Sequence, residues 1–438
     1  MKKRVSSLRQ KIFWLRDSVK GNPIKTELNS TQKLLNNSVP DSFSMQSSLE
    51  HLLQHAVTTT DFYKGCNLLN GLDSFPIINK NTIRDHFDEF KSSKYDVSKC
   101  RKVSTSGSTG SPFSVYHNKE KIKKNIADNI YFSEKSNYQL GDFLVYVKIW
   151  SDTFSFKKKL DFQLKNMHPL SVFNLSDNEI KAFVSRLNKQ SSEVCFIGYA
   201  SCFEKICKYL DKLKENPITF KTKSIITISE ALNDYTRHSV RKYFGIQPLS
   251  RYSNNENGII AQQIEEGDLK FKINDSSYVV EIFDLNSDKK LNYGERGRIV
   301  VTDLYNWATP LVRYDTGDVG VMQLDDNKRP YFTEVSGRKL DLLYDTKGNL
   351  VPSHLSAKLC KYGKYKQFQL VQKTKNMYQV NLNTDTKIDE EELVKEYKSY
   401  FGSDAEIKIN YVDDIPLLNS GKRREVVNEY YNSNQLNG

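Results

Sequence analysis

The chain has 438 residues, of which 38% are hydrophobic and 27% charged, as in a soluble globular protein with a full core. It has no run of about 18 apolar residues, so the sequence predicts no transmembrane helix. The formal net charge of +12 favours anionic partners, but the basic residues are scattered and form no zinc-finger or RNA-binding motif, so we expect no nucleic-acid partner. The six cysteines form no CxxC pair, which predicts free thiols in the cytoplasm.

The basic N-terminal segment, residues 1–45, is the first predicted element. Val5, Leu8, Ile12 and Leu15 recur at helical spacing among lysines and arginines, without the apolar core of a signal peptide. One interpretation is a solvated helix packed on the main domain. The other is a helix over residues 1–20 that lies on an anionic membrane, which would place a cytoplasmic protein at the inner face of the membrane.

The next region, residues 46–338, is predicted to be an α/β domain. Helical patterns alternate with short apolar runs, and this rhythm predicts a mainly parallel sheet. Ser201, with Glu204 three residues later, predicts a helix N-cap. The helical patterns cover 47–63, 177–190, 201–217 and 233–245, and the strand-like runs cover 142–150, 193–200 and 223–229.

From about residue 279 the strand-like segments follow one another with turns between them, which predicts a β-rich, antiparallel subdomain. Residues 339–438 hold two strand patterns and a helix pattern. We expect them to form a small α+β domain.

The stretch VSTSGSTGSPFS, residues 103–114, holds two glycines and six hydroxyl residues between its ends. It lacks the lysine of a Walker loop and contains no GxGxxG. Glycines let the backbone approach a ligand closely, and successive N–H groups and hydroxyls can bind phosphate oxygens. On composition alone, a flexible Ser/Gly connector explains the stretch equally well. The candidate phosphate-binding residues are Ser104, Thr105, Ser106, Gly107, Ser108, Thr109 and Gly110.

Further segments decide between these interpretations because they occur in a fixed order along the chain. After TSGSTGSP come RYSNNENG, PLVRYDTGD, SGRKLD and PLLNSGKRREV. Together they resemble the signatures of the adenylate-forming superfamily, which includes acyl-CoA ligases and adenylation domains. Segments such as FPIINKNTIRDHFDEF and VVTDLYNWATPLVRYDTGD are similar to the phenylacetate-CoA ligase group and, within it, to CapK-like proteins of polysaccharide gene clusters. The resemblance covers about residues 46–427. It implies that residues 46–338 form the ATP- and acyl-binding domain and that residues 339–438 form a mobile lid.

The resemblance implies roles in ATP binding for residues of the middle segments. Asp318 would hold the ribose, Glu256 would hold Mg²⁺, and Tyr252 would stack near the adenine, with Asn254 and Asn255 beside the phosphates. A turn-stabilising Asp and a solvated loop Glu are the simpler interpretations of the first two, taken alone. Ser229, Glu230 and Ala231 would line the adenine through their backbone, although a helix N-cap explains them as well.

The same resemblance implies roles for residues near the lid. Arg338 would contact the ribose or a phosphate, and Asp341 would be the hinge of the swinging domain. Lys422 would reach the α-phosphate and the carboxylate as negative charge develops. A surface Arg–Asp pair and one more solvated lysine are the simpler interpretations.

The chain departs from the superfamily pattern in two segments. Ser253 stands where glycine is usual and Asn255 where Thr or Ser is usual, which leaves the shape of the pocket open. Phe113 follows Pro112 where many acyl-CoA synthetases have Pro-Lys-Gly, a lysine that the phenylacetate-CoA ligase group also lacks.

For the acyl pocket we expect Tyr199, at the end of a buried strand, and less strongly His168. The implied reaction activates a small carboxylic acid with ATP and Mg²⁺ and passes the acyl group to coenzyme A. Three alternatives stay open: a sugar acceptor or an amine acceptor in a polysaccharide precursor, and a non-catalytic nucleotide-binding homologue.

Overall fold

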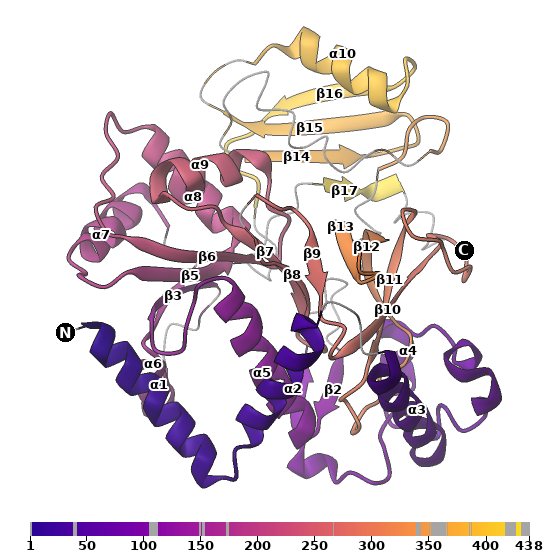
Figure 1. The fold of residues 1–438 in the computed structure, drawn as a ribbon. Coiled ribbons are helices and arrows are strands. Elements are labelled where there is room, and N and C mark those ends of the chain that lie inside the picture. The colour runs from indigo at the N-terminus through magenta and orange to yellow at the C-terminus, as the bar shows by residue number, and fades with distance from the viewer. Residues whose placement is uncertain are drawn as a thin grey trace.

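The structure is a computed structural model. It describes residues 2–37, 42–104, 113–148, 150, 154–171, 175–265, 267–338, 343–349, 351, 365, 367–384, 386, 388–416 and 426–430. Within these residues, an eleven-stranded sheet runs through the large domain in the order β10-β11-β12-β13-β9-β8-β7-β6-β5-β3-β4. A separate small sheet forms the C-terminal domain (Figure 1). The predicted fold class is confirmed.

Five neighbouring strands of the large sheet are parallel. They are β3 (Phe143–Lys148), β4 (Met167–Ser171), β5 (Val194–Tyr199), β6 (Thr222–Ile228) and β7 (Leu249–Asn254). Helices α7 (Asp177–Asn188), α8 (Ala200–Asp211) and α9 (Asp234–Phe244) cover one face of this part through a shared apolar core (Figure 1). The crossover helices leave the carboxyl ends of these strands at one edge, where ligands collect in α/β folds.

The other six strands are antiparallel to their neighbours. They are β8 (Gly258–Gln263), β9 (Phe271–Ile273), β10 (Tyr278–Phe283), β11 (Arg296–Asp303), β12 (Tyr314–Leu324) and β13 (Pro330–Arg338). The antiparallel part therefore begins at β8, before the change in sequence texture at residue 279. It begins there because β7 and β8 form a hairpin through the turn at residues 255–257.

The remaining elements of the large domain lie mostly before β3. A two-stranded sheet joins β1 (Arg101–Ser104) to β2 (Ser114–His117). The helices are α1 (Lys2–Val19), α2 (Pro23–Asn36), α3 (Ser42–Thr59), α4 (Lys80–Asp85), α5 (Lys119–Lys135) and α6 (Phe156–Lys165), with short 3-10 helices η1 (Leu68–Ser74) and η2 (Val97–Lys99). Among the residues that the structure describes, none of the helices combines the length and the apolar composition needed to span a bilayer.

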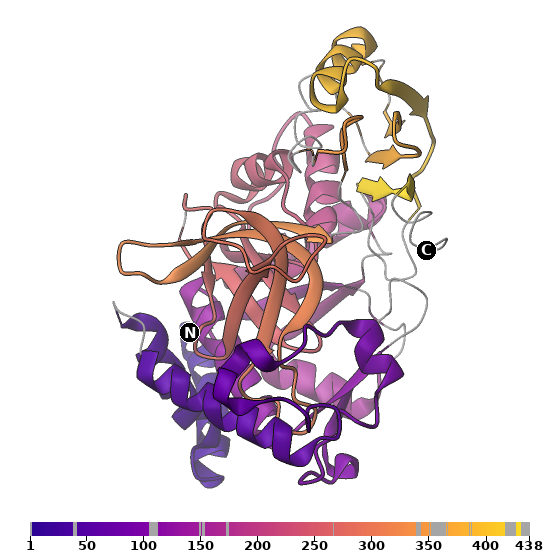
Figure 2. The ribbon, with the colours of Figure 1, turned by 90° about the vertical axis from the view of Figure 1, so that its right-hand side faces the viewer.

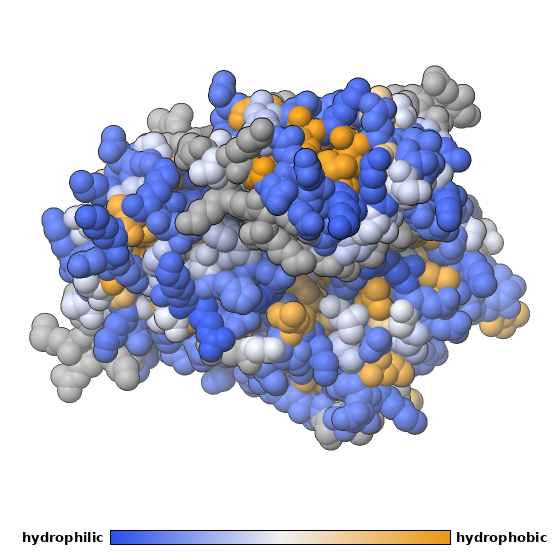
Figure 3. All heavy atoms as spheres, turned by 90° about the horizontal axis from the view of Figure 1, so that it is seen from above, coloured by the Kyte–Doolittle hydropathy of each residue, from blue (hydrophilic) through white to orange (hydrophobic). Residues whose placement is uncertain are grey.

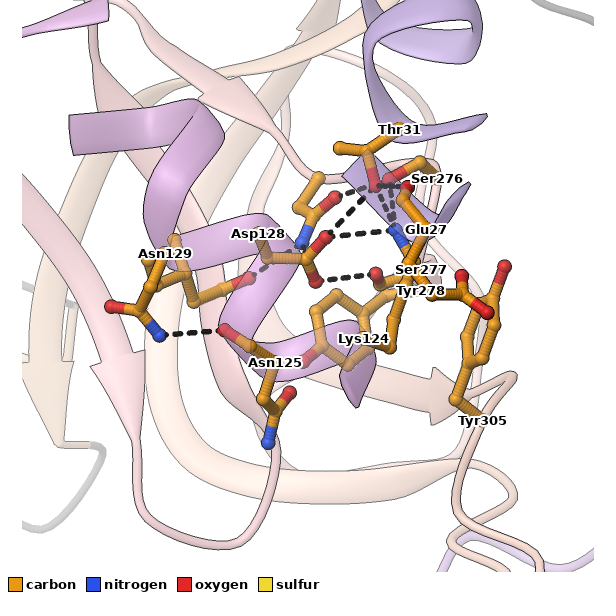
Figure 4. A network of polar contacts seen from close by, with 12 residues as sticks. Glu27, Thr31, Lys124, Asn125, Asp128, Asn129, Ser276, Ser277, Tyr278 and Tyr305 are labelled. Atoms are coloured by element: carbon orange, nitrogen blue, oxygen red, sulfur yellow. Dashed lines mark hydrogen bonds and ion pairs between the residues drawn. The ribbon is translucent and has the colours of Figure 1, made fainter. Parts of the chain in front are cut away.

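Helix α2 of the N-terminal segment is joined to the large domain by a buried polar network (Figure 4). The Lys124 ammonium of α5 donates to Thr31 Oγ1 of α2 and pairs with Asp128, both at 2.7 Å. Asp128 also accepts a hydrogen bond of 2.6 Å from Ser277 Oγ. Because a buried charge must be paired or hydrogen-bonded, this network fixes α2 against α5 and the start of β10.

The C-terminal domain lies above the large sheet in Figures 1 and 2. Its four strands are β14 (Gln367–Gln372), β15 (Met377–Asn383), β16 (Glu406–Tyr411) and β17 (Val426–Asn428), in the order β16-β15-β14-β17, with α10 (Glu390–Phe401) packed on them. Seen from above, its outer surface is mostly hydrophilic (Figure 3). Lys208 of α8 lies 4.7 Å from the centre of the Tyr365 ring, which brings this domain close to α8.

One local prediction is wrong. Ser201 was predicted to cap the helix that follows β5, but α8 begins at Ala200 and its N-cap residue is Tyr199, without a side-chain cap bond. Instead, the backbone N–H of Ser201 donates to the Glu230 carboxylate at 2.8 Å. Glu230 can reach α8 because β5 and β6 are neighbouring parallel strands, whose carboxyl ends meet at one edge of the sheet. Its negative charge also stabilises the N-terminus of α8 through the helix dipole.

Candidate functional site

The segment after β6 has an unusual backbone. Ser229 directly follows the strand with φ = 69°, a left-handed conformation that non-glycine residues rarely adopt. Such strain is retained where surrounding structure or function requires it. Glu230 follows, with its side chain committed to α8, and Ala231 is exposed. These three predicted adenine-lining residues therefore lie at the carboxyl edge of the sheet.

Asp318 and Tyr252 come from different strands and contact each other. The Tyr252 hydroxyl donates to Asp318 Oδ2 at 2.8 Å and lies 3.1 Å from Thr316 Oγ1. Burial is the main cause that raises the pKa of the Tyr252 phenol, and the charge of Asp318 raises it further. The phenol therefore stays protonated and acts as a donor. The backbone of Asp318 pairs with that of Arg338 across β12 and β13. The site is thus assembled where β7 faces the start of the β12–β13 hairpin.

Glu256 lies in the β7–β8 turn and is 1% exposed. Its carboxylate accepts a hydrogen bond of 2.6 Å from the Tyr314 hydroxyl, and the Lys80 ammonium lies 3.7 Å away. Its backbone carbonyl accepts a hydrogen bond of 2.8 Å from His117 Nε2, so that nitrogen carries the proton. Burial, and then the nearby Lys121, lowers the pKa of His117 to about 4, which keeps the ring neutral.

The two ends of the Ser/Gly-rich stretch meet each other, and the second end is linked to Glu256 through Tyr314. Ser104 Oγ and Ser114 Oγ are 2.8 Å apart at its neck, and the Phe113 ring stacks on Tyr314 with 6.2 Å between ring centres. Tyr314 is the residue that donates to Glu256. Six of the seven predicted phosphate-binding residues lie outside the described residues: Thr105, Ser106, Gly107, Ser108, Thr109 and Gly110.

Lys80 was not predicted to be a site residue. Ile78, two residues before it, bonds to the backbone of both Arg313 and Asp315, at 3.0 and 2.7 Å, so α4 begins beside the RYDTGD segment. Lys80 Nζ also lies 5.8 Å from the centre of the Phe113 ring. Its ammonium is therefore next to both the buried carboxylate and the neck of the loop. The segment FPIINKNTIRDHFDEF carried the resemblance, but no pattern within it marked the lysine.

The other predicted residues are scattered more widely. Asn254 bonds to Asn257 within the β7–β8 turn, and Asn255 is exposed beside Glu256. Tyr199 is the last residue of β5 and lies where the parallel strands end. His168 is the second residue of β4, the outermost strand of the sheet, and stacks on Phe143 near the start of these strands. Asp341, Lys422 and the side chain of Arg338 lie outside the described part of the chain.

Comparison with known proteins supports the resemblance. Residues 343–429 match the family described as the CapK C-terminal domain. The C-terminal domain is therefore similar to this family over most of its length.

The similarity to CapK extends beyond this domain. The whole chain is 25% identical to Protein CapK of Staphylococcus aureus in an alignment of 417 residues that covers 89% of each protein. It is 23% identical to the phenylacetate-coenzyme A ligase of Pseudomonas putida, over 88% of this chain and 85% of that one. The predicted resemblance to the CapK-like branch is confirmed.

The fold also matches solved ligases. 2-Hydroxyisobutyryl-CoA ligase, in the postadenylation state with R3-HIB-AMP, superposes with a TM-score of 0.65 and 16% identity over 90% of each chain. At this identity the match shows that the fold is that of an adenylate-forming ligase. Through its similarity to the CapK C-terminal domain and this fold, the chain is similar to adenylate-forming enzymes.

Proposed function

We propose that the protein is an adenylating enzyme that uses ATP and Mg²⁺ to activate a carboxylic acid. The observation that carries the proposal is the convergence of the Tyr252–Asp318 pair, the buried Glu256 and the neck of the Ser/Gly-rich loop at one edge of the sheet. They come from three sequence signatures: RYSNNENG holds both Tyr252 and Glu256, PLVRYDTGD holds Asp318, and the Ser/Gly-rich stretch begins with Ser104. In the proposed reaction the acid attacks the α-phosphate of ATP, pyrophosphate leaves, and a nucleophile then takes the acyl group and releases AMP.

The proposed role of Asp318 is to accept hydrogen bonds from the ribose hydroxyls. An ionised carboxylate has several lone-pair sites, and the Tyr252 hydroxyl uses one of them on Oδ2. Tyr252 would hold this carboxylate in place and present its ring to the adenine beside Ser229, Glu230 and Ala231. Arg338, opposite Asp318 in the strand pair, would contact the ribose or a phosphate.

Glu256 fits a Mg²⁺ ion that also binds phosphate oxygens, since Mg²⁺ is commonly held by one or two carboxylates plus phosphate. The ion, when bound, neutralises phosphate charge during the displacement. Lys80, 3.7 Å from Glu256, would bind a phosphate from the other side. Ser104 and the loop residues up to Gly110, with Asn254 and Asn255, would supply uncharged donors to the same phosphates.

Lys422 would supply positive charge to the α-phosphate and the attacking carboxylate, and it would leave the site when the lid domain turns about Asp341. The domains we propose are residues 1–45, 46–338 and 339–438. The last strand of the large sheet ends at Arg338, and the strands of the small sheet begin at Gln367, which supports a hinge between them. Tyr199 would contact the acyl group, whereas the position of His168 gives no support to such a role.

We propose coenzyme A as the acceptor, because the ligase relatives named above are CoA ligases. The CapK similarity favours a role in capsule or polysaccharide formation, in which a sugar hydroxyl or an amine would be the alternative acceptor. Pyrophosphate release from ATP with a panel of acids, with and without CoA, separates these cases. Release that CoA does not accelerate would exclude a CoA ligase, and nucleotide binding without any release would favour a non-catalytic homologue.

Peripheral contact of a cytoplasmic protein with an anionic membrane is a further part of the proposal. Four exposed apolar residues form one stripe on α1, and Arg16 and Lys11 flank it. The one acidic residue in the described part of α1, Asp17, is buried and accepts from two N–H groups of α2. The stripe consists of Leu8, Ile12, Leu15 and Val19, which are 56%, 37%, 66% and 82% exposed.

Co-sedimentation with vesicles tests the membrane contact. Binding to phosphatidylserine-containing vesicles, but not to neutral ones, is the expected result for the full chain. The double variant Leu15→Gln, Val19→Gln should lose it, whereas Leu213→Gln, an exposed leucine just beyond α8, should not. Equal sedimentation of all three proteins would exclude the membrane role.

A further inference from the structure

The parallel part of the sheet has a second set of charged residues at its carboxyl edge. Tyr199 pairs in register with Ile228, and Ile228 pairs with Arg251. Lys148 follows Val147, the partner of Gly198, so it stands beside Tyr199 on the other side. Residues in register on parallel strands point to the same face. A row of Lys148, Tyr199, Ile228 and Arg251 therefore lies across the edge where we expect the acyl group.

Arg251 is 7% exposed, yet its three hydrogen-bond partners in the described chain are all neutral. They are Gln262 Oε1, Asn129 Oδ1 at 3.3 Å and Ser133 Oγ at 3.2 Å. Burial lowers the pKa of Arg251 to about 10, and the phenols of Tyr146 and Tyr138 oppose this shift. Buried arginines normally pair with a carboxylate, because a lone buried charge is costly. The guanidinium is thus held in place but not neutralised.

Lys148 shows the same feature at the other end of the row. Its ammonium lies 4.3 Å from the centre of the Trp150 ring and 5.0 Å from that of Tyr146, and in the described chain it forms no ion pair with an acid. Burial, and then the charge of Lys158, lowers the pKa of Lys148. Aromatic faces attract a cation but leave its charge available to an anion.

One hydrogen-bond partner of Arg251 lies at the surface, on helix α5. Asn129, one of its partners, is an exposed residue and lies apart from the Lys124 network in Figure 4. Neighbouring residues of a strand point to opposite faces, so Arg251 and Tyr252 lie on opposite sides of β7. A ligand could therefore meet the nucleotide at the edge of the sheet and extend toward Arg251 on the other face.

We propose that the acid activated by this protein carries a second anionic group, a carboxylate or a phosphate, which Arg251 and Lys148 bind. This inference rests on the proposed adenylating function and names its substrate class. The reactive carboxylate meets ATP on the Tyr252 side, and Tyr199 and Ile228 contact the short carbon chain. The strands of Lys148 and Arg251 are about 14 Å apart, with β5 and β6 between them. The second anion therefore lies over β5 and β6, where the long side chains of both cations extend to it. A long apolar acid would leave both of them without a counter-ion.

The test compares acids of matched length on the wild-type protein. Pyrophosphate release is measured with butyrate, succinate and 3-phosphonopropionate, a phosphonate that stands for the phosphate, and binding of the same acids is followed by thermal shift in the presence of ATP. We expect kcat/KM to be at least about tenfold higher for an acid with a second anion, as for a hydrogen bond to a charged group. The two anionic acids separate a carboxylate site from a phosphate site. A preference for butyrate in both assays would overturn the proposal.

The variants Arg251→Met and Lys148→Met sharpen the test. Each should raise KM for the preferred diacid about tenfold or more, with kcat and the values for butyrate nearly unchanged. Lys159→Met, which removes an exposed charge from α6, is the control. Equal losses for both acids would show that Arg251 only joins α5 to β7 and β8. If ATP binds but no acid causes release, the adenylating function fails, and the thermal shifts with acid still decide whether an anion site exists.

Discussion

The two faces of β7 differ in the charge that they hold. On the Tyr252 side, the carboxylates of Asp318 and Glu256 are fixed by tyrosine hydroxyls. On the Arg251 side, a guanidinium is fixed by amides and a serine, and Lys148 lies on aromatic rings. In each case neutral groups hold the charged group in place, and on the acidic side the Lys80 ammonium also lies 3.7 Å from Glu256. The acidic side suits a ribose and a metal ion, and the basic side suits an anion.

The largest expected effect concerns Lys422, a positive charge that belongs to neither face of β7 and is supplied by the C-terminal domain. Lys422→Ala should slow acid-dependent pyrophosphate exchange about 100- to 1000-fold, because it removes the cation that we propose stabilises developing negative charge. The matched control is Arg423→Ala, which removes the neighbouring positive charge and should retain most of the activity. Unchanged exchange in Lys422→Ala would assign the catalytic cation to another residue, with Lys80 the first candidate.

On the acidic face, Glu256→Gln removes the charge but keeps the shape and can still accept from Tyr314. We expect about 100-fold slower pyrophosphate release and a weaker dependence on Mg²⁺, since a metal ion contributes several kcal/mol of charge stabilisation. A titration of activity against Mg²⁺ measures both. If the half-saturating Mg²⁺ concentration does not change, the metal is held elsewhere.

His117 offers a pH test of the same face. Its pKa is about 4 in the folded protein and near 6.5 when unfolded, so the unfolded chain binds more protons between these values. The free energy of unfolding should therefore be highest above pH 6.5 and should fall by about 3 kcal/mol as the pH drops to 4. Urea unfolding of the wild type and of His117→Gln at several pH values measures this loss. A variant with the same loss over pH 6.5–4 would rule out His117 as its source.

The smallest effect is expected from Tyr252→Phe, which keeps the ring but removes the hydroxyl that holds Asp318. A hydrogen bond to a charged group contributes about 1.5–3 kcal/mol, so ATP binding should weaken by about tenfold or somewhat more. Asp318→Asn should weaken it further, because it alters the group that contacts the ribose. Calorimetric titration of ATP gives both affinities. Equal affinity in Tyr252→Phe and the wild type would mean that the hydroxyl does not position Asp318.

Much of the acidic face could be predicted from the sequence. Tyr252, Glu256 and Asp318 stood in short signatures in a fixed order, and the structure brings them to one edge of the sheet. Lys80 and Arg251 could not be predicted, because their surroundings depend on contacts with residues far away in the chain. Lys80 is placed by the pairing of Ile78 with Arg313 and Asp315, and Arg251 by α5.

The sequence by itself determined the alternation of helices and strands, the order of the site segments and the CapK-like resemblance. These depend on local composition and periodicity, which a single chain displays directly. Only the tertiary structure decided that Glu230 caps α8, that His168 lies on an edge strand, and that Lys148 and Arg251, in one row with Tyr199, have no carboxylate partner in the described chain. Burial and charge pairing are set by neighbours brought together through folding, so no local pattern encodes them.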